Sequence, residues 1–268
     1  MTKLKYSFKN DILFKMYFLR NQEQLKWLIA LILRIPLGSI TEFIIINTEM
    51  PPETIRSKYS HLDINMKVNG KVVNLEIQVG NEGDYVQRAA FLAAREYSMN
   101  VPSGKPYTAV PPVIVISIIN FKLWKAKKVH TVYHIWEDDE HELMLKELEW
   151  HFFELPKLGK EINIDDELNL WLKLFDTNTE EDIKKLQELG VPFVQQVINS
   201  YRELTGDSEF LRLAWMREDA KRREAAALHH ARETEREKWQ VVVAEQAAAL
   251  ADKDAEIMRL LALLEEKR

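Results

Sequence analysis

The stretch HLDINMKVNGKVVNLEIQV, residues 61–79, decides the fold predicted for this chain. Two runs of alternating apolar and polar residues flank Asn69-Gly70, the strongest short-range signal for a two-residue hairpin turn. With this turn, Asp63 falls directly opposite Glu76. Side chains in such a pair lie about 4.5–5.5 Å apart at Cβ, where like charges destabilise the sheet. The predicted hairpin therefore places two carboxylates face to face, and the chain must compensate for their repulsion.

Two interpretations of the carboxylate pair are open. In the first, Asp63 and Glu76 belong to the solvated polar face of a half-buried antiparallel pair. In the second, they hold a divalent cation, because Mg²⁺ prefers oxygen ligands and is commonly bound by one or two carboxylates plus water and substrate phosphate. Such an ion would polarise a phosphodiester and lower the pKa of a bound water. Gln78 projects from the same face two residues later and is placed to orient that water by hydrogen bonding.

Composition excludes several classes of protein. The chain has 268 residues, of which 46% are hydrophobic and 29% charged, as in an ordinary soluble protein. It has no cysteine, which excludes disulfides and thiolate metal sites. With 8 glycines and no Gly-rich phosphate loop, it is not expected to bind a nucleotide cofactor. The first ten residues lack a signal-peptide core, and the apolar runs 27–33 and 113–119 are too short to span a membrane. We therefore expect a cytoplasmic protein.

Charge is distributed unevenly along the chain. Residues 1–130 carry 18 Lys+Arg against 10 Asp+Glu, a net +8, whereas residues 131–200 carry 6 against 17, a net −11. Residues 201–268 carry 13 against 15, a net −2. A polyanion is therefore expected to bind the first half of the chain. Within that half, four lysines surround Trp124 and form either a solvated loop or a phosphate contact with salt-dependent binding: Lys122, Lys125, Lys127 and Lys128.

Periodicity and turn signals predict a mixed order of helices and strands. The predicted helices are two within 12–35, capped by Asn10-Asp11 and joined near Asn21, one at 83–100, and three after residue 164. The predicted strands are 43–48, the hairpin, 113–121, 129–136 and 150–155, with a loop at 50–60. After Gly206 the chain has no Gly or Pro, which predicts a long helix or a coiled coil. The predicted domains are 1–175, 176–206 and 207–268.

The C-terminal segment has an imperfect heptad pattern. One seam recurs every seven residues as Val243, Leu250, Ile257 and Leu264, whereas the other carries Gln240, Ala247 and Asp254 before Leu261. Both a coiled coil and a solitary helix are compatible with this pattern.

Six motifs occur together in one order. They are NDILFKMYF at 10–18, LDI at 62–64, LEIQV at 75–79, Arg88 in the following helix, PPVIVISIINF at 111–121 and HFFELPKL at 151–158. In this order the sequence resembles the PD-(D/E)xK nuclease superfamily, specifically its transposase-like group, also called recombination-promoting nucleases. The resemblance covers about the first 175 residues, and its order is more specific than any single motif.

The resemblance implies a fold and a chemistry. The fold would be an α/β restriction-endonuclease-like mixed central sheet flanked by helices, here with an all-helical C-terminal extension. The activity would be DNA cleavage dependent on Mg²⁺, with Mn²⁺ as an alternative. By motif match, Asp63, Glu76 and the backbone carbonyl of Ile77 would be metal ligands. Gln78 stands where the wider superfamily has lysine, which puts in doubt how the attacking water is activated.

Further residues of the resemblance have two open roles each. Asp11 is either the N-cap of the first helix or part of the opening signature that reaches the metal site, and Lys15 is spaced to pair with it. Arg88 either contacts a scissile phosphate or forms a surface salt bridge. Glu154 and Lys157 are more readily explained as structural residues at a strand end.

Three hypotheses for function follow. The favoured one is a metal-dependent endonuclease that hydrolyses phosphodiester bonds of duplex DNA in transposition or recombination, and that forms a homo-oligomer through its C-terminal helix. The second is a catalytically silent DNA-binding or assembly protein that keeps the fold. The third is a coiled-coil scaffold with a globular head, which would have no affinity for DNA.

Overall fold

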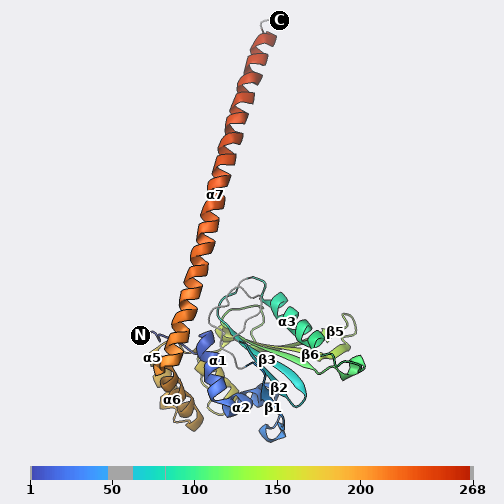
Figure 1. Ribbon diagram of the computed structural model, residues 1–268, viewed down its shortest axis with the longest axis vertical. Coiled ribbons are helices and arrows are strands. Elements are labelled where there is room, and N and C mark those ends of the chain that lie inside the picture. The colour runs from blue at the N-terminus through green and yellow to red at the C-terminus, as the bar shows by residue number, and fades with distance from the viewer. Residues whose placement is uncertain (1, 48–62, 82, 266–268) are drawn as a thin grey trace. The chain divides into compact units, whose positions relative to one another are not determined.

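The computed structural model describes residues 2–47, 63–81 and 83–265 (Figure 1). His61, Leu62 and the predicted loop 50–60 lie outside the described residues. The chain divides into two compact units, Met1–Arg217 and Glu218–Arg268, and the boundary falls within the long helix α7 (Ser208–Glu265). Residues 176–206 and the first turns of α7 therefore belong to the same compact unit as the sheet.

Two helices open the first unit, as the sequence predicted. They are α1 (Asp11–Arg20) and α2 (Gln22–Leu33), and they meet at Asn21. The N-cap of α1 is Asn10, whose side chain accepts a hydrogen bond of 2.9 Å from the Leu13 amide. Asp11 is thus the first helical residue, and its prediction as the cap is wrong by one position.

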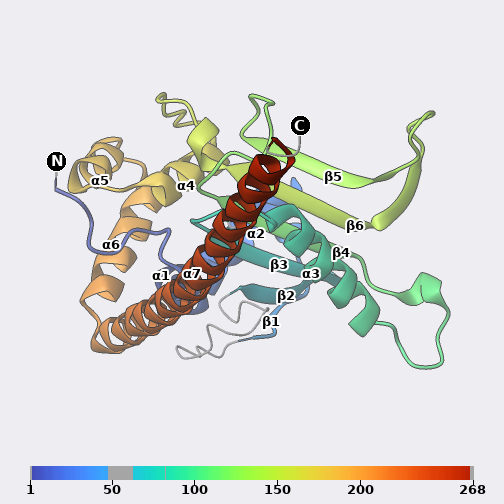
Figure 2. The same ribbon diagram turned by 90° about the horizontal axis from the view of Figure 1, so that it is seen from above.

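Among the described residues, six strands form one mixed sheet in the order β1-β2-β3-β4-β6-β5, and Figure 2 shows them side by side. They are β1 (Phe43–Ile45), β2 (Ile64–Val68), β3 (Lys71–Gln78), β4 (Val113–Ile119), β5 (His130–Trp136) and β6 (Leu143–Glu154). Strands β3, β4 and β6 are parallel, and the other neighbouring pairs are antiparallel. The predicted mixed α/β sheet is confirmed. The first strand is shorter than predicted and β6 begins earlier, because cross-strand pairing rather than composition sets their ends.

The hairpin forms in the predicted register. Ile64 pairs with Leu75, and the ladder continues in step to the turn. Asn69 and Gly70 both have positive φ, 48° and 75°, as a two-residue type I′ turn requires. Asp63 lies one residue before β2, at the position that faces Glu76 in this register.

Helices cover both faces of the sheet. Helix α3 (Tyr85–Met99) covers one face, where Ala93 packs with residues of β3 and β4. On the other face lies the main core, to which α1, α2, α4 (Glu167–Asp176), α6 (Pro192–Gly206) and the start of α7 contribute, with α5 (Glu180–Glu188) beside α6. Glu76, on the polar face of the hairpin, lies under α3 and is only 1% exposed, and Asp63 is 5% exposed, whereas Lys67 on the same face is exposed. The interpretation of a solvated face is therefore wrong for the two carboxylates.

No helix in the described part of the chain is both long and apolar enough to cross a membrane.

A chain of hydrogen bonds links three side chains of β5 and β6. His130 Nε2 lies 2.9 Å from His151 Nδ1, and His151 Nε2 lies 2.6 Å from Glu149 Oε1. Burial, His151 and Arg34 lower the pKa of His130 to about 4. His130 is therefore neutral in the folded protein at neutral pH.

Acid should destabilise the fold through His130. The folded-state pKa of about 4 lies below the ordinary value of 6.5, so the unfolded chain binds more protons between these values. Stability from this residue is complete above pH 6.5 and is lost as the pH falls through about 4. Denaturant titrations should show a loss of about 1–2 kcal/mol between pH 6.5 and 4.5, because one pKa unit is about 1.4 kcal/mol and partial exposure screens some of it.

His130→Gln should flatten this pH dependence, whereas His229→Gln, on the exposed part of α7, should leave it unchanged. An equally steep profile in the His130 variant would contradict the assignment.

Candidate active site

Glu76 is the centre of the candidate site. It lies in β3, buried between the sheet and α3. Its Oε1 accepts hydrogen bonds from the Tyr85 hydroxyl and from Ser117 Oγ, the latter at 3.3 Å, and its Oε2 accepts one of 2.9 Å from Arg88. Ser117 reaches Glu76 because the two residues pair directly in the β3–β4 ladder. A buried carboxylate is stable here because charged and neutral donors replace its hydration.

Tyr85 and Arg88 come from the first turn of α3. Their spacing of three residues puts both on the helix face that meets the sheet. The Arg88 guanidinium lies 5.6 Å from the centroid of the Tyr85 ring, within the range of a cation–π contact. Burial and the charge of Glu76 raise the pKa of Tyr85. The Tyr85 hydroxyl therefore stays protonated and donates a hydrogen bond to the carboxylate.

Hydrogen bonds to the backbone on either side of Ile64 hold Asp63 in place, directly before the start of β2. Asn47 Nδ2 donates to the Asp63 carbonyl, and Asn47 Oδ1 accepts from the Asn65 amide, both at 2.7 Å. These two bonds fix the chain on both sides of Ile64. The Asp63 side chain is 5% exposed, so it is nearly as buried as Glu76.

Arg88 is the cation that both carboxylates share. Its burial lowers its pKa, but the charges of Glu76 and Asp63 raise it, and the net effect is an increase. The repulsion across the hairpin is therefore compensated within the chain. In this structure Arg88 supplies positive charge beside Glu76, and the divalent cation inferred from the sequence stays a prediction.

Gln78 ends β3 on the same strand as Glu76. Its Nε2 donates to the Gly80 carbonyl at 3.1 Å, so in this structure its amide closes the strand end. The ladder pairs Ile77 with Ile118 of β4. The metal and water roles assigned to Gln78 and the Ile77 carbonyl stay predictions.

The four lysines lie in the connection between β4 and β5, residues 120–129, here named the lysine loop. All four are exposed: Lys122, Lys125, Lys127 and Lys128. Trp124 anchors the loop by packing against the rings of Tyr133, which is tilted to it, and Phe152, which meets it edge to face. Because Gln78 pairs with Ile119 in parallel strands, the loop starts at the sheet end where β3 also ends. The lysine loop therefore begins at the sheet end where β3 finishes, and the binding of phosphate by its lysines stays a prediction.

Asp11 has a structural partner. Its Oδ2 accepts from Arg217 Nε at 3.0 Å, which ties α1 to the start of α7. Lys15, in the same helix, is fully buried. A role for Asp11 in the active site stays a prediction.

Glu154 and Lys157 form a buried ion pair that holds the lysine loop. Glu154 is 0% exposed and Lys157 is 6% exposed. Glu154 also accepts a 2.8 Å hydrogen bond from the Leu123 amide, within the lysine loop. The ELPKL motif, which had no assigned mechanism, therefore anchors the loop to the end of β6.

Glu154→Ala should destabilise the first unit by about 3–5 kcal/mol, because a buried lysine loses its counter-charge. Denaturant titration measures this change. Glu188→Ala provides the control: its pair with Lys184 is exposed and long, at 3.8 Å, and its loss should cost less than about 0.5 kcal/mol. A similar small cost for both variants would contradict the anchoring role.

The side chains of the site that could bind a divalent metal ion are the two carboxylates, Asp63 and Glu76. Among the residues that the structure describes, no group of three or more His, Asp or Glu side chains is placed to hold a metal ion. Mg²⁺ is commonly bound by only one or two carboxylates and completes its shell with water and phosphate. Asp63 and Glu76, both oxygen donors held on neighbouring strands, fit that requirement.

Comparison with known families decides the classification. Residues 8–231 match the family model of the PD-(D/E)XK nuclease family transposases. The chain belongs to this family. The matched region includes both carboxylates, the lysine loop and the start of α7, so it extends beyond the 175 residues on which the resemblance rested. Neither the curated proteins nor the solved structures gave a significant match.

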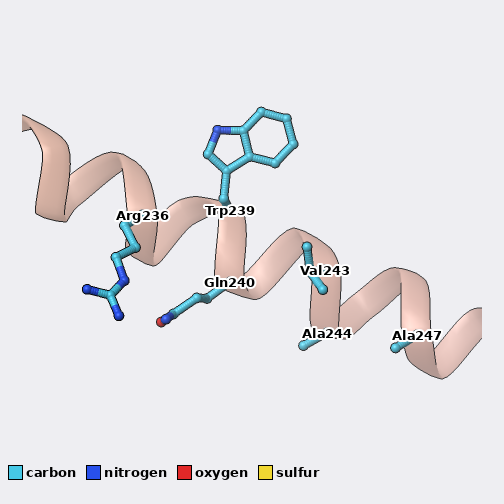
Figure 3. Close-up of a pocket in the computed structure, with 6 residues that line it drawn as sticks. All are labelled: Arg236, Trp239, Gln240, Val243, Ala244 and Ala247. Atoms are coloured by element: carbon cyan, nitrogen blue, oxygen red, sulfur yellow. The ribbon is translucent and has the colours of Figure 1, made fainter.

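A shallow hollow in the second unit does not compete with this site. Its lining comes from successive turns of α7 alone and contains no carboxylate (Figure 3): Arg236, Trp239, Gln240, Val243, Ala244 and Ala247. This hollow therefore offers no acidic side chain to a metal ion.

Three residues of the site were not found from the sequence. Ser117 carried a signal, since it is the single polar residue within the apolar strand VIVISII. Tyr85 could have been found from its spacing to Arg88. Asn47 gave no signal, because its partner backbone is 16 to 18 residues away.

Proposed function

We propose that this family member is a divalent-metal-dependent endonuclease that hydrolyses phosphodiester bonds of duplex DNA during transposition or recombination. The observation that carries the proposal is the register of the hairpin, which sets buried Asp63 opposite buried Glu76 next to one arginine. Burying two acids together costs stability. Such an arrangement is typical of a functional site rather than of a sheet built for stability.

Each residue of the site has a separate role in the proposed reaction. Asp63 and Glu76, with the Ile77 carbonyl, would hold Mg²⁺ or Mn²⁺, which when bound polarises the scissile phosphate and acidifies a water. Tyr85 and Ser117 hold Glu76 Oε1 and so fix the orientation of the carboxylate. Gln78 orients the attacking water by hydrogen bonding without supplying charge. Arg88 is 23% exposed and is long enough to contact a phosphate.

The lysine loop binds the phosphate backbone of duplex DNA. Four exposed ammonium groups lie at the sheet end where β3 finishes, on an anchored loop in the basic half of the chain. Contacts of this kind release counterions from the phosphate backbone, so binding should weaken steeply with salt.

A supercoiled-plasmid assay tests the proposed activity. The wild type should nick or linearise DNA with Mg²⁺ or Mn²⁺ and not with EDTA. Asp63→Ala should lower the rate by at least about a hundredfold, because the loss of even an outer-shell partner of a metal costs 10–100-fold. Asp138→Ala, an exposed surface change, is the control. Equal cleavage by the Asp63 variant, or none by the wild type with any divalent ion, would contradict the proposal.

A silent DNA-binding protein is the second candidate, and one observation favours it. Arg88, Tyr85 and Ser117 already satisfy the Glu76 carboxylate within the chain. In that case DNA binding would survive the loss of both carboxylates, and Mn²⁺ would not raise the melting temperature. A metal ion that binds only the native state should raise the melting temperature by mass action.

The second unit is proposed to make the protein a homo-oligomer. Within α7 the recurring apolar residues are all more than half exposed, which leaves a seam for another helix: Val243, Leu250, Ile257 and Leu264. Sedimentation of the full chain and of a chain ending at Arg217 should give an oligomer and a monomer, respectively. The same oligomeric state in both would contradict this role.

A further inference from the structure

Arg88 holds the oxygen of Glu76 that a metal would need. Oε1 is already committed to the Tyr85 hydroxyl and Ser117 Oγ, which are both buried groups. Oε2 faces Arg88 at 2.9 Å. A cation that uses the Glu76 carboxylate without breaking the buried Tyr85 contact must therefore bind Oε2.

A guanidinium and a divalent ion cannot share this position. Like charges a few ångströms apart repel strongly in a buried setting, and Arg88 already interacts with the charges of both Glu76 and Asp63. The carboxylate pair can thus be neutralised by Arg88 or by the metal, but not by both at the same oxygen.

The Arg88 side chain is free to move toward solvent, whereas the Glu76 side chain is fixed in place. Its side chain is 23% exposed, while Glu76 is 1% exposed and fixed by three donors. A planar guanidinium released from a carboxylate is also well matched to a phosphate, which it binds through two parallel hydrogen bonds.

We propose that Arg88 competes with the divalent metal for Oε2 of Glu76, so that metal binding displaces Arg88 toward the phosphate of bound DNA. This inference rests on the proposed function. Arg88 then has two opposite effects: it weakens metal binding in the protein without DNA, and it is required for cleavage. It also keeps the buried carboxylates compensated when no metal is bound.

Manganese titration of the full chain without DNA tests the competition. Arg88→Met removes the charge but keeps a long side chain, and it should bind Mn²⁺ about tenfold more tightly than the wild type by electron paramagnetic resonance. Its melting temperature in EDTA should fall, and Mn²⁺ should raise it more than it raises that of the wild type. At saturating Mn²⁺ its plasmid cleavage should nevertheless be slower.

Arg95→Met is the matched control. Arg95 lies on the same helix, two turns further on, and pairs with Glu96 rather than with Glu76. Its manganese affinity and cleavage rate should equal those of the wild type. If Arg88→Met does not fold, Arg88→Gln replaces it, with the same expected increase in affinity.

The outcomes separate the two proposals. If Asp63→Asn abolishes Mn²⁺ binding and the folded Arg88 variant binds Mn²⁺ no more tightly than the wild type, the competition is wrong and the metal site stands. If Asp63→Asn leaves Mn²⁺ binding unchanged, or the wild type and the Arg88 variant both fail to bind, the metal site and the competition fail together.

Discussion

The structure depends on how one buried carboxylate is supplied with hydrogen-bond donors. Glu76 sits under α3, and its two oxygens receive a tyrosine hydroxyl, a serine hydroxyl and an arginine from two different elements. Each donor requires a particular placement: β4 parallel and in register with β3, and α3 packed on this face with its first turn over the strand. The electrostatics of the site and the arrangement of the fold therefore constrain each other.

The sheet also places basic and acidic groups at one of its ends. Because β3, β4 and β6 run parallel, their carboxyl ends lie at one end of the sheet. Gln78 is the last residue of β3 and Glu154 the last of β6, and the lysine loop follows β4 at the same end. A buried ion pair between Glu154 and Lys157 anchors the loop at this end. Acidic and basic groups are thus separated into a buried site and an exposed rim, an arrangement that suits a negatively charged substrate and a positively charged cofactor.

The features that could be predicted from the sequence are those set by local patterns of residues. The Asn69-Gly70 turn fixed the hairpin register, and through it the opposition of Asp63 and Glu76, because a side-chain period of two leaves no freedom once the turn is set. Apolar periodicity located α1, α2 and α3, and the long apolar run located β4. The order of motifs supplied the family, which the family model then confirmed.

What could not be predicted was contact between distant segments. Whether the polar face of the hairpin meets water or α3 depends on packing, and the solvated alternative failed for that reason. The pairing of Arg88 with Glu76, of Asp11 with Arg217, and of Glu154 with the Leu123 amide links residues that no spacing rule connects. Arg88 forms an ion pair with buried Glu76 rather than a surface salt bridge, and its contact with a phosphate stays a prediction.

The central claim is that Asp63 and Glu76 form a cation site whose positive charge Arg88 otherwise supplies. A crystal structure determined with Mn²⁺, using its anomalous signal, tests it most directly. The account predicts one manganese ion in contact with carboxylate oxygens of both acids, with the Arg88 guanidinium turned away from Glu76 Oε2. An ion bound elsewhere, or Arg88 still bound to Glu76 at saturating Mn²⁺, would contradict it.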